Sequence, residues 1–207
     1  IGGTGSGKST LVNLLPRLYD ATVGEVKVFG RDVREYSLKE LRFLFGVVPQ
    51  NAALFSGTVR SNLFWGNDKA TDEEFDEALK VACAYDFVYE KGGLDEKVAE
   101  GGRNFSGGQR QRLTIARAVA AKPEILILDD SCSALDFATD AAVRANIAAL
   151  EGVTTFIVSQ RASSLHGADV IFVMEDGKII GRGRHEELYG TCPLYTEICD
   201  SQARAAV

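Results

Sequence analysis

Apolar and polar residues recur along the chain with two different periods, and each period predicts a different kind of element. Residues 25–29 alternate polar and apolar side chains between two glycines, as a half-buried strand does. Residues 125–128 are apolar throughout, which is typical of a strand buried on both faces. Thr71 and Glu74 have the spacing of a helix capping box, and apolar residues at helical spacing follow over 75–82.

The remaining pattern completes an alternation of strands and helices. Further strands are predicted at residues 45–48, 154–158 and 170–174, and helices at residues 8–15, about 108–120 and about 136–150. This alternation indicates an α/β fold with a mostly parallel sheet that helices cover on both faces. Only Ile1 precedes the first glycine-rich segment, so we expect the N-terminal strands of the sheet to be truncated.

The stretch from about residue 52 to residue 102 differs from the rest, because it has helical signals and no buried strand. We interpret it as a helical subdomain inserted into the α/β core. Residues 1–207 are therefore predicted to form a single domain, with a core of residues 1–50 and 110–207 and a subdomain of about 51–109.

The composition is that of an ordinary globular protein, with 45% hydrophobic and 25% charged residues. The net charge of -6 provides no electrostatic reason to expect nucleic acid as a partner. No apolar run approaches the about 20 residues that span a bilayer, so this part of the chain is not expected to cross a membrane.

The four cysteines, Cys83, Cys132, Cys192 and Cys199, include no CxxC pair and have no histidine at metal-ligand spacing. We therefore expect reduced thiols in a cytosolic protein, in preference to a zinc site or a disulfide framework. The chain opens directly on a functional motif, so no signal peptide is expected.

Residues 2–9 have the sequence GGTGSGKS and match the phosphate-loop pattern GxxxxGK[ST]. Glycines allow successive backbone N–H groups to point at phosphate oxygens, Lys8 would bridge the β and γ phosphates, and Ser9 would offer its hydroxyl to Mg²⁺. The alternative is a glycine-rich turn before a helix, which the lysine and serine disfavour. The residues predicted to bind the triphosphate of ATP are Gly2, Gly3, Thr4, Gly5, Ser6, Gly7, Lys8, Ser9 and Thr10.

The apolar segment 125–128 ends in two carboxylates, Asp129 and Asp130. A buried strand that ends in aspartate is how phosphate-loop proteins hold Mg²⁺, so Asp129 is the predicted metal ligand. Buried strands often end in aspartate, but the combination with a phosphate loop makes this assignment specific.

Residues 105–112, FSGGQRQR, resemble the LSGGQ signature of ATP-binding cassette (ABC) ATPases, with Phe105 in place of leucine. An isolated SGGQ string could be a simple helix cap, but here it lies between the two phosphate-site motifs. The resemblance implies a P-loop NTPase of the RecA-like type whose signature closes over the ATP of a partner domain. The signature residues expected to contact this ATP are Ser106, Gly107, Gly108 and Gln109.

The resemblance extends over nearly the whole chain. Gln50 stands where the family has a glutamine that contacts Mg²⁺ and reports the nucleotide state to transmembrane domains. Residues 133–136, SALD, match the D-loop that passes between two nucleotide-binding domains. The segments SLKELR, LFSGTVRSNL and VAEGG are similar to the exporter branch of the family.

Two positions depart from the family pattern, and both concern hydrolysis. The family has a glutamate after the Mg²⁺ aspartate, whereas this chain has Asp130, whose carboxylate is about 1 Å shorter in reach, enough to cost about 100-fold in rate. Gln160 replaces the switch histidine, and it cannot become cationic. Either change alone is compatible with tolerated drift. Lys8 is assigned to catalysis along with these two residues. The two departures together predict a site that binds ATP and hydrolyses it slowly.

The resemblance thus implies the ATP-binding and ATP-hydrolysing domain of an ABC exporter, using ATP and Mg²⁺ at the cytoplasmic face of a membrane. The implied partners are a second, non-identical nucleotide-binding domain and transmembrane domains, and not nucleic acid. One alternative is a regulatory subunit in which ATP acts as a clamp without turnover. Another is a soluble ABC ATPase acting on DNA or ribosomes, which the acidic charge and the exporter-like segments disfavour.

Overall fold

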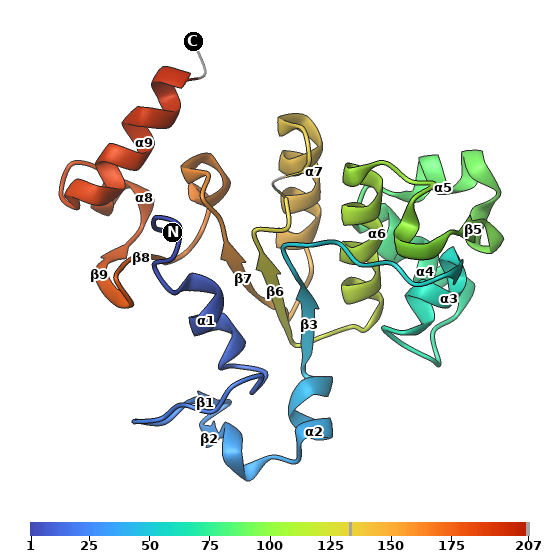
Figure 1. Ribbon diagram of the computed structural model, residues 1–207, viewed down its shortest axis with the longest axis horizontal. Coiled ribbons are helices and arrows are strands. Elements are labelled where there is room, and N and C mark those ends of the chain that lie inside the picture. The colour runs from blue at the N-terminus through green and yellow to red at the C-terminus, as the bar shows by residue number, and fades with distance from the viewer. Residues whose placement is uncertain (133, 206–207) are drawn as a thin grey trace. The chain divides into compact units, whose positions relative to one another are not determined.

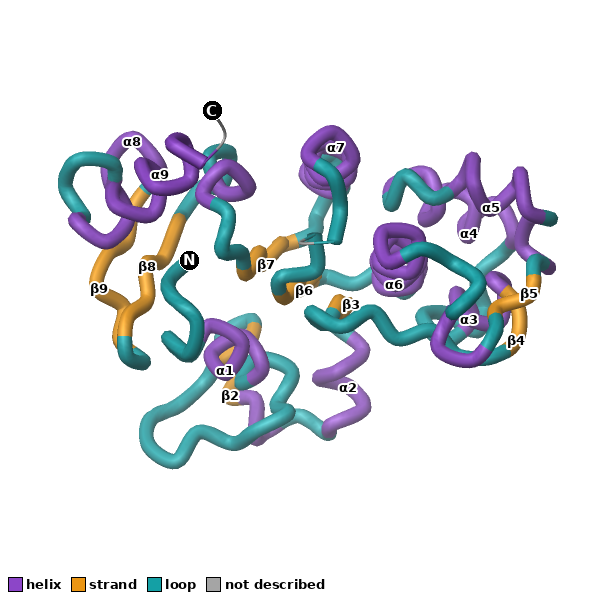
Figure 2. Tube along the Cα trace, turned by 45° about the horizontal axis from the view of Figure 1, so that its top comes forward, coloured by secondary structure: helices purple, strands orange, loops and turns teal. Residues whose placement is uncertain are grey.

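The computed structural model describes residues 1–132 and 134–205, and Figures 1 and 2 show the course of the chain. These residues form two compact units. One contains residues 1–41 and the described residues from 157 onward, and the other contains residues 42–156.

The unit of residues 42–156 is built on parallel strands. β3 (Phe45–Val48) pairs in parallel with β6 (Ile125–Asp129), and β6 has as its other neighbour β7 (Thr154–Val158), a strand that crosses the boundary of the units. All five residues of β6 are buried, as the uninterrupted apolar run predicts. The predicted α/β fold with a parallel sheet core is therefore confirmed.

Gly46 allows β3 to lie close to the helix that begins within the signature motif. A Cβ atom at this position would lie 2.8 Å from the carbonyl oxygen of Ala118 and 2.9 Å from Cγ of Pro123. Real Cβ atoms essentially never approach other heavy atoms so closely. The glycine in β3 thus permits the close packing of this strand against α6 (Gly107–Ala120).

The other helices of this unit confirm most of the predicted pattern. Thr71 and Glu74 form the capping box that begins α4 (Asp72–Val81), and the buried Phe75 and Leu79 lie on the inner face of this helix. Both α3 (Val59–Phe64) and α4 contact α6. The helical elements are α3 (Val59–Phe64), α4 (Asp72–Val81), α5 (Tyr85–Lys91), η2 (Gly93–Asp95), η3 (Glu100–Gly102), α6 and α7 (Phe137–Ala148).

One short sheet within this stretch was not predicted. β4 (Gly57–Thr58) pairs antiparallel with β5 (Lys97–Val98). Each strand has two residues, which is too short for alternation of apolar and polar side chains to be visible in the sequence. The subdomain boundaries at about residues 51 and 109 stay a prediction.

The other unit combines the first 41 residues with the C-terminal part of the chain. β8 (Ile171–Glu175) and β9 (Lys178–Gly183) form an antiparallel hairpin, of which only the first strand was predicted. β9 is largely exposed and has neither a buried run nor strict alternation. The remaining elements are α1 (Lys8–Asn13), β1 (Lys27–Val28), β2 (Arg31–Asp32), η1 (Val33–Glu35), α2 (Leu38–Phe43, which crosses the boundary of the units), η4 (Ala162–Leu165), α8 (His185–Leu188) and α9 (Pro193–Ala205).

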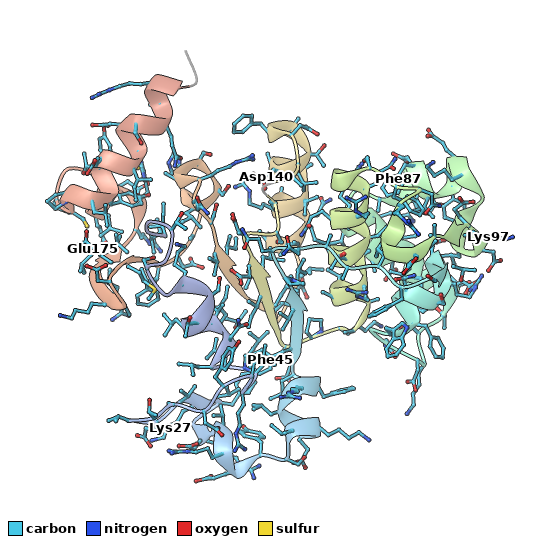
Figure 3. All side chains as sticks on the ribbon, in the orientation of Figure 1. Lys27, Phe45, Phe87, Lys97, Asp140 and Glu175 are labelled. Carbon is cyan, nitrogen blue, oxygen red and sulfur yellow. The ribbon has the colours of Figure 1, made fainter. Side chains whose placement is uncertain are left out.

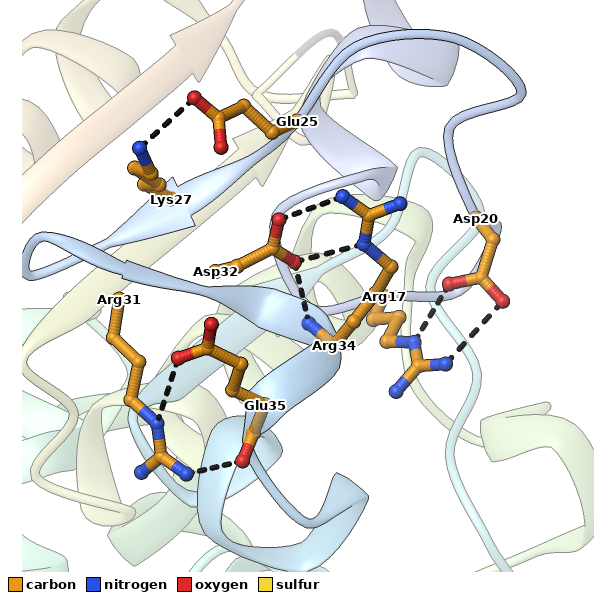
Figure 4. A network of polar contacts seen from close by, with 8 residues as sticks. All are labelled: Arg17, Asp20, Glu25, Lys27, Arg31, Asp32, Arg34 and Glu35. Carbon is orange, nitrogen blue, oxygen red and sulfur yellow. Dashed lines mark hydrogen bonds and ion pairs between the residues drawn. The ribbon is translucent and has the colours of Figure 1, made fainter.

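Charged side chains surround the β1–β2 hairpin, as Figure 4 shows. The Arg34 guanidinium donates to both carboxylate oxygens of Asp32, at 3.0 and 2.8 Å, and lowers the pKa of that carboxyl to about 2. Lys27 pairs with Glu25 at 2.9 Å. Arg34, Lys27 and Glu25 are half-exposed, so solvent screens both pairs, although the Asp32 side chain itself is only 11% exposed.

Among residues 1–132 and 134–205, no helix has both the length and the apolar character that crossing a membrane requires.

Candidate functional site

The phosphate-loop segment is closed by its own lysine. The Lys8 ammonium donates to the carbonyl oxygens of Gly2 at 2.9 Å and Gly3 at 2.6 Å, and to Oγ of Ser6 at 3.2 Å. Lys8 is the first residue of α1, so the start of this helix places the ammonium beside the loop. A single positive charge is thereby held against the inner side of the glycine-rich turn.

The loop is anchored to the β8–β9 hairpin. Gly2 forms a parallel bridge with Met174, and a Cβ on Gly2 would lie 2.1 Å from the Met174 carbonyl oxygen. The Gly177 N–H donates to the carbonyl oxygen of Ser6 at 3.1 Å. Gly2 and Gly7 have φ of 154° and 92°, values that side-chain-bearing residues rarely adopt. These contacts explain why glycine is needed where the loop touches the hairpin.

The rest of the loop leaves space along its backbone. A Cβ on Gly3 or Gly5 would meet no atom within 4 Å, and Gly5 has a φ of 80°. Thr4, Ser9 and Thr10 are exposed, and Ser6 is buried. An open, side-chain-free backbone beside an ammonium group has the shape and the charge that a chain of phosphates requires.

In the unit of residues 42–156, the strand β6 delivers two carboxylates in succession. Asp129 ends the strand and is 9% exposed, whereas Asp130 follows in a left-handed conformation with a φ of 47°. Aspartate is one of the few residues other than glycine that adopt this conformation readily. The Gln50 side-chain amide donates to Oδ2 of Asp130 at 3.3 Å, so two predicted site residues that are 80 positions apart lie in contact.

The residues after Asp130 form a buried polar neighbourhood. Burial, together with the nearby Asp140 carboxylate, raises the pKa of the Cys132 thiol to about 12, so this thiol stays protonated at neutral pH. Asp140 pairs with Arg144 at 3.1 Å. Ser133, the first residue of the predicted D-loop, lies outside the described residues, and Asp136 at its end caps α7 by accepting from the Thr139 N–H at 2.9 Å.

The signature residues begin α6. Ser106 Oγ accepts from the Gln109 N–H at 3.2 Å, and the Gln109 side chain accepts from the Ser106 N–H at 3.0 Å, which completes a capping box. The segment is therefore a helix cap, as the simpler interpretation expects. The two glycines between them differ: a Cβ on Gly107 would meet no atom within 4 Å, and one on Gly108 would lie 3.3 Å from the Ala134 carbonyl oxygen.

Phe105, which replaces the leucine of the signature, is buried. Its ring lies 6.2 Å from the ring of Phe87 on α5, edge to face, and Figure 3 labels Phe87. The substitution therefore keeps an apolar anchor under the start of α6.

Gln160 lies in the loop after β7, in the unit that also contains the phosphate loop. Its side chain is exposed, and its carbonyl oxygen accepts from Nε2 of Gln202 at 2.6 Å. The Gln202 side-chain oxygen in turn accepts from the Ala162 N–H at 2.9 Å. One side chain of α9 thus holds the backbone on both sides of Arg161.

An exposed aromatic surface, which the sequence analysis did not single out, consists of Phe55, Phe64 and Trp65. Trp65 is 71% exposed and each phenylalanine is 50% exposed. The rings of Phe55 and Trp65 lie 5.2 Å apart, and the Arg117 guanidinium lies 5.5 Å from the Phe55 ring. Nη1 of Arg117 is buried without a hydrogen-bond partner among the described residues. The sequence did carry a signal for this surface, because residues 55–65 contain three aromatic residues among mostly polar ones.

A glycine-rich phosphate loop that ends in lysine and serine, in a chain with a parallel sheet core, defines a P-loop nucleotide-binding protein. The profile of a family described as "ABC transporter" matches residues 1–133 of the chain. The chain belongs to this family, as the signature segment predicted, and contains its ATP-binding domain.

The relatives are ABC transporter proteins that are longer than this chain. An uncharacterized ABC transporter ATP-binding protein of Mycobacterium tuberculosis is 51% identical over 210 residues, which cover 100% of the chain and 36% of that protein. A putative multidrug export ATP-binding/permease protein of Staphylococcus aureus is 42% identical, with 98% of the chain and 35% of that protein covered. The chain therefore spans about a third of the length of these relatives.

A solved structure of a bacterial Atm1-family ABC exporter with ATP bound matches the fold with a TM-score of 0.92. The two are 36% identical, and the match covers 100% of this chain and 36% of the exporter chain. The nucleotide-binding domain is therefore of the exporter type.

Proposed function

We propose that this chain binds ATP with Mg²⁺ and serves as the ATPase domain of an exporter at the cytoplasmic face of a membrane. The observation that carries the proposal is the open glycine backbone of the phosphate loop with the Lys8 ammonium held against it at 2.6–3.2 Å. Phosphate oxygens would replace the carbonyl and hydroxyl oxygens as acceptors for this ammonium.

Ser9, Gln50 and Asp129 are the residues we assign to Mg²⁺. Hydroxyl, amide and carboxylate oxygens are the ligand types that a hard cation of this size prefers. A bound Mg²⁺ would neutralise phosphate charge, and the protein groups would hold and orient the triphosphate. The nearly buried position of Asp129 at the end of β6 keeps its carboxylate fixed for this role.

We further propose that the site formed by this chain's own motifs hydrolyses ATP slowly. Asp130 would orient the attacking water in place of a glutamate, and its shorter side chain is already engaged by Gln50 at 3.3 Å. Gln160 would donate a hydrogen bond to the γ phosphate but would supply no positive charge. The phosphate loop keeps its full set of residues and the signature keeps Ser106 to Gln109, so binding is expected to be retained.

The partner in this proposal is a second, non-identical nucleotide-binding domain, whose ATP the residues Ser106, Gly107, Gly108 and Gln109 would contact. The start of α6 is suited to this contact because the N–H groups of Gly107 and Gly108, in the first turn, have no acceptor within the helix, and the helix dipole favours an anion. The two unusual residues, Asp130 and Gln160, also favour a second candidate, a regulatory subunit that holds ATP as a clamp without turnover in either site.

The variant Gly107→Ala tests the proposal and separates the two candidates. The added methyl group meets no atom of the described chain within 4 Å, so folding is expected to be unaffected. Against a bound phosphate the same methyl group would displace the contact by about 1 Å, which lowers the rate by about 100-fold. The measurement is steady-state ATP hydrolysis by the intact transporter with its partner domain.

Gly167→Ala is the matched control, because this glycine also has no atom within 4 Å of a Cβ and lies outside the signature. Normal hydrolysis by the control and a large loss with Gly107→Ala would support the proposed contact. Unchanged hydrolysis by both variants would contradict it and favour the clamp.

The transmembrane domains are the second partner, and we propose that the surface of Phe55, Phe64 and Trp65 docks them. The relatives include an ATP-binding/permease protein of which this chain covers 35%, so a permease part is the occupant to expect. Three half-exposed or exposed aromatic side chains form a surface that gains apolar burial on docking.

Trp65→Ala is expected to reduce export in vesicles by at least about tenfold, since the loss of a central interface tryptophan typically costs 2 kcal/mol or more, while ATP binding persists. Phe43→Ala is the control, because Phe43 lies in α2 and is 77% exposed, similar to Trp65 at 71%. Equal export by both variants and the parent would refute the docking role.

A further inference from the structure

The chain has only two histidines, and the fold brings their rings together at a tilt of 37°. His166 follows η4 and His185 begins α8, and their ring centroids lie 4.0 Å apart. Cys199 of α9 completes the group, and one ligand atom from each of the three residues lies within 4.8 Å of the others. All three residues belong to the same compact unit.

We propose that His166, His185 and Cys199 form a binding site for Zn²⁺. Two imidazole nitrogens and one thiolate are the donor types that Zn²⁺ selects, and three protein ligands leave a fourth position for water. Tetrahedral zinc with bonds of about 2.0–2.3 Å places its ligand atoms about 3.3–3.8 Å apart. The ligand atoms of this group lie within 4.8 Å of one another, so the group is at most about 1–1.5 Å wider than a loaded site, and side-chain rotations can close such a difference. His166 is exposed, so an ion can enter from solvent.

A buried tyrosine supports two of the three ligands. Tyr195 is fully buried, and its hydroxyl lies 2.9 Å from Nδ1 of His185. In the tautomer that carries its proton on Nδ1, His185 donates to this hydroxyl and leaves Nε2 for the metal. Burial raises the pKa of the Cys199 thiol, and the Tyr195 hydroxyl acts in the opposite direction. Partners of this kind commonly orient the ligands of protein metal sites.

The proposed ion would strengthen a contact that the fold already makes. Gln202, on the same helix as Cys199, binds the backbone at Gln160 and Ala162 at 2.6 and 2.9 Å. His166 lies at the end of this backbone segment. Zn²⁺ bound between Cys199 and His166 would therefore tie α9 to residues 160–166 at a second point. The existence of the site does not depend on the proposed function in ATP hydrolysis.

Titration of the intact, metal-free protein with Co²⁺ tests the site, because a thiolate ligand gives cobalt a charge-transfer absorption that histidine alone does not give. We expect this absorption in the parent protein and its disappearance when Zn²⁺ is added in competition. Cys199→Ser is expected to abolish it, and His166→Gln is expected to weaken Zn²⁺ binding by about 100-fold. Because His166 is exposed, the latter variant is expected to fold normally.

Two further variants make the result specific. Cys83→Ser is the control, because Cys83 is a partly buried free thiol in the other compact unit, and the cobalt absorption is expected to persist. Tyr195→Phe keeps the buried ring and removes the hydroxyl, and a loss of about 10- to 100-fold in Zn²⁺ affinity is expected. No cobalt absorption in the parent protein, or an absorption that Cys199→Ser leaves intact, would overturn the proposal.

Discussion

Replacing Lys8 by alanine is expected to weaken the binding of ATP by about 100-fold or more. The ammonium group holds three oxygen acceptors of the loop at 2.6–3.2 Å, and no other residue of the loop carries a positive charge. Charge-assisted hydrogen bonds contribute about 1.5–3 kcal/mol each, so the loss of two bonds to phosphate corresponds to a factor of about 100 or more. Titration calorimetry with Mg²⁺-ATP measures the change.

The Lys8 variant also removes three hydrogen bonds within the loop, so its effect must be separated from a loss of structure. Lys8→Met retains most of the length of the side chain without its charge, and its thermal unfolding reports whether the loop and α1 remain folded. Lys178→Ala is the control, because this lysine is exposed on β9 in the same unit. An unchanged affinity for ATP in a folded Lys8 variant would exclude the loop as the triphosphate site.

Replacing Asp130 and Gln160 by the glutamate and histidine of the family pattern is expected to raise turnover at this chain's own site by about 100-fold. Asp130→Glu extends the carboxylate by about 1 Å, and a positioning error of that size accounts for about 100-fold in rate. Gln160→His adds a side chain that can become cationic. Single-turnover hydrolysis with the partner domain's own phosphate loop inactivated would isolate this site.

The single variants serve as controls for the double variant, since residues that act as a unit do not contribute additively. Asp130 has a φ of 47°, and glutamate tolerates the left-handed region less well than aspartate, so thermal stability must be compared as well. No gain over the parent in a stable double variant would show that the departures do not limit hydrolysis.

Local patterns in the sequence predicted the elements whose determinants are contiguous. The apolar run of β6, the capping box of α4 and the N-cap of α6 are each specified by a few neighbouring residues. Backbone conformation responds to such neighbours within a turn or a strand, so these predictions were confirmed to within one or two residues at each end. The short strands β4 and β5 were missed because two residues carry no period.

The candidate sites also divide into those that are continuous in the sequence and those that the fold assembles from distant residues. The phosphate loop is continuous, so its residue types and spacing define it before any fold is known. Gln50 and Asp130 lie in contact across 80 positions, and only the parallel pairing of β3 with β6 brings the ends of these strands together. The aromatic surface beside Arg117 likewise depends on the packing of α3 against α6.

The cysteine pattern shows most clearly what spacing along the sequence cannot predict. Spacing along the chain indicated no metal site, since the two histidines and Cys199 have none of the short separations of known zinc motifs. The fold gathers them because η4, α8 and α9 pack around the buried Tyr195. The sequence by itself thus determined the family and the phosphate-binding residues, which depend on local backbone geometry. Tertiary structure alone decided which distant side chains meet, because such contacts depend on how whole elements pack together.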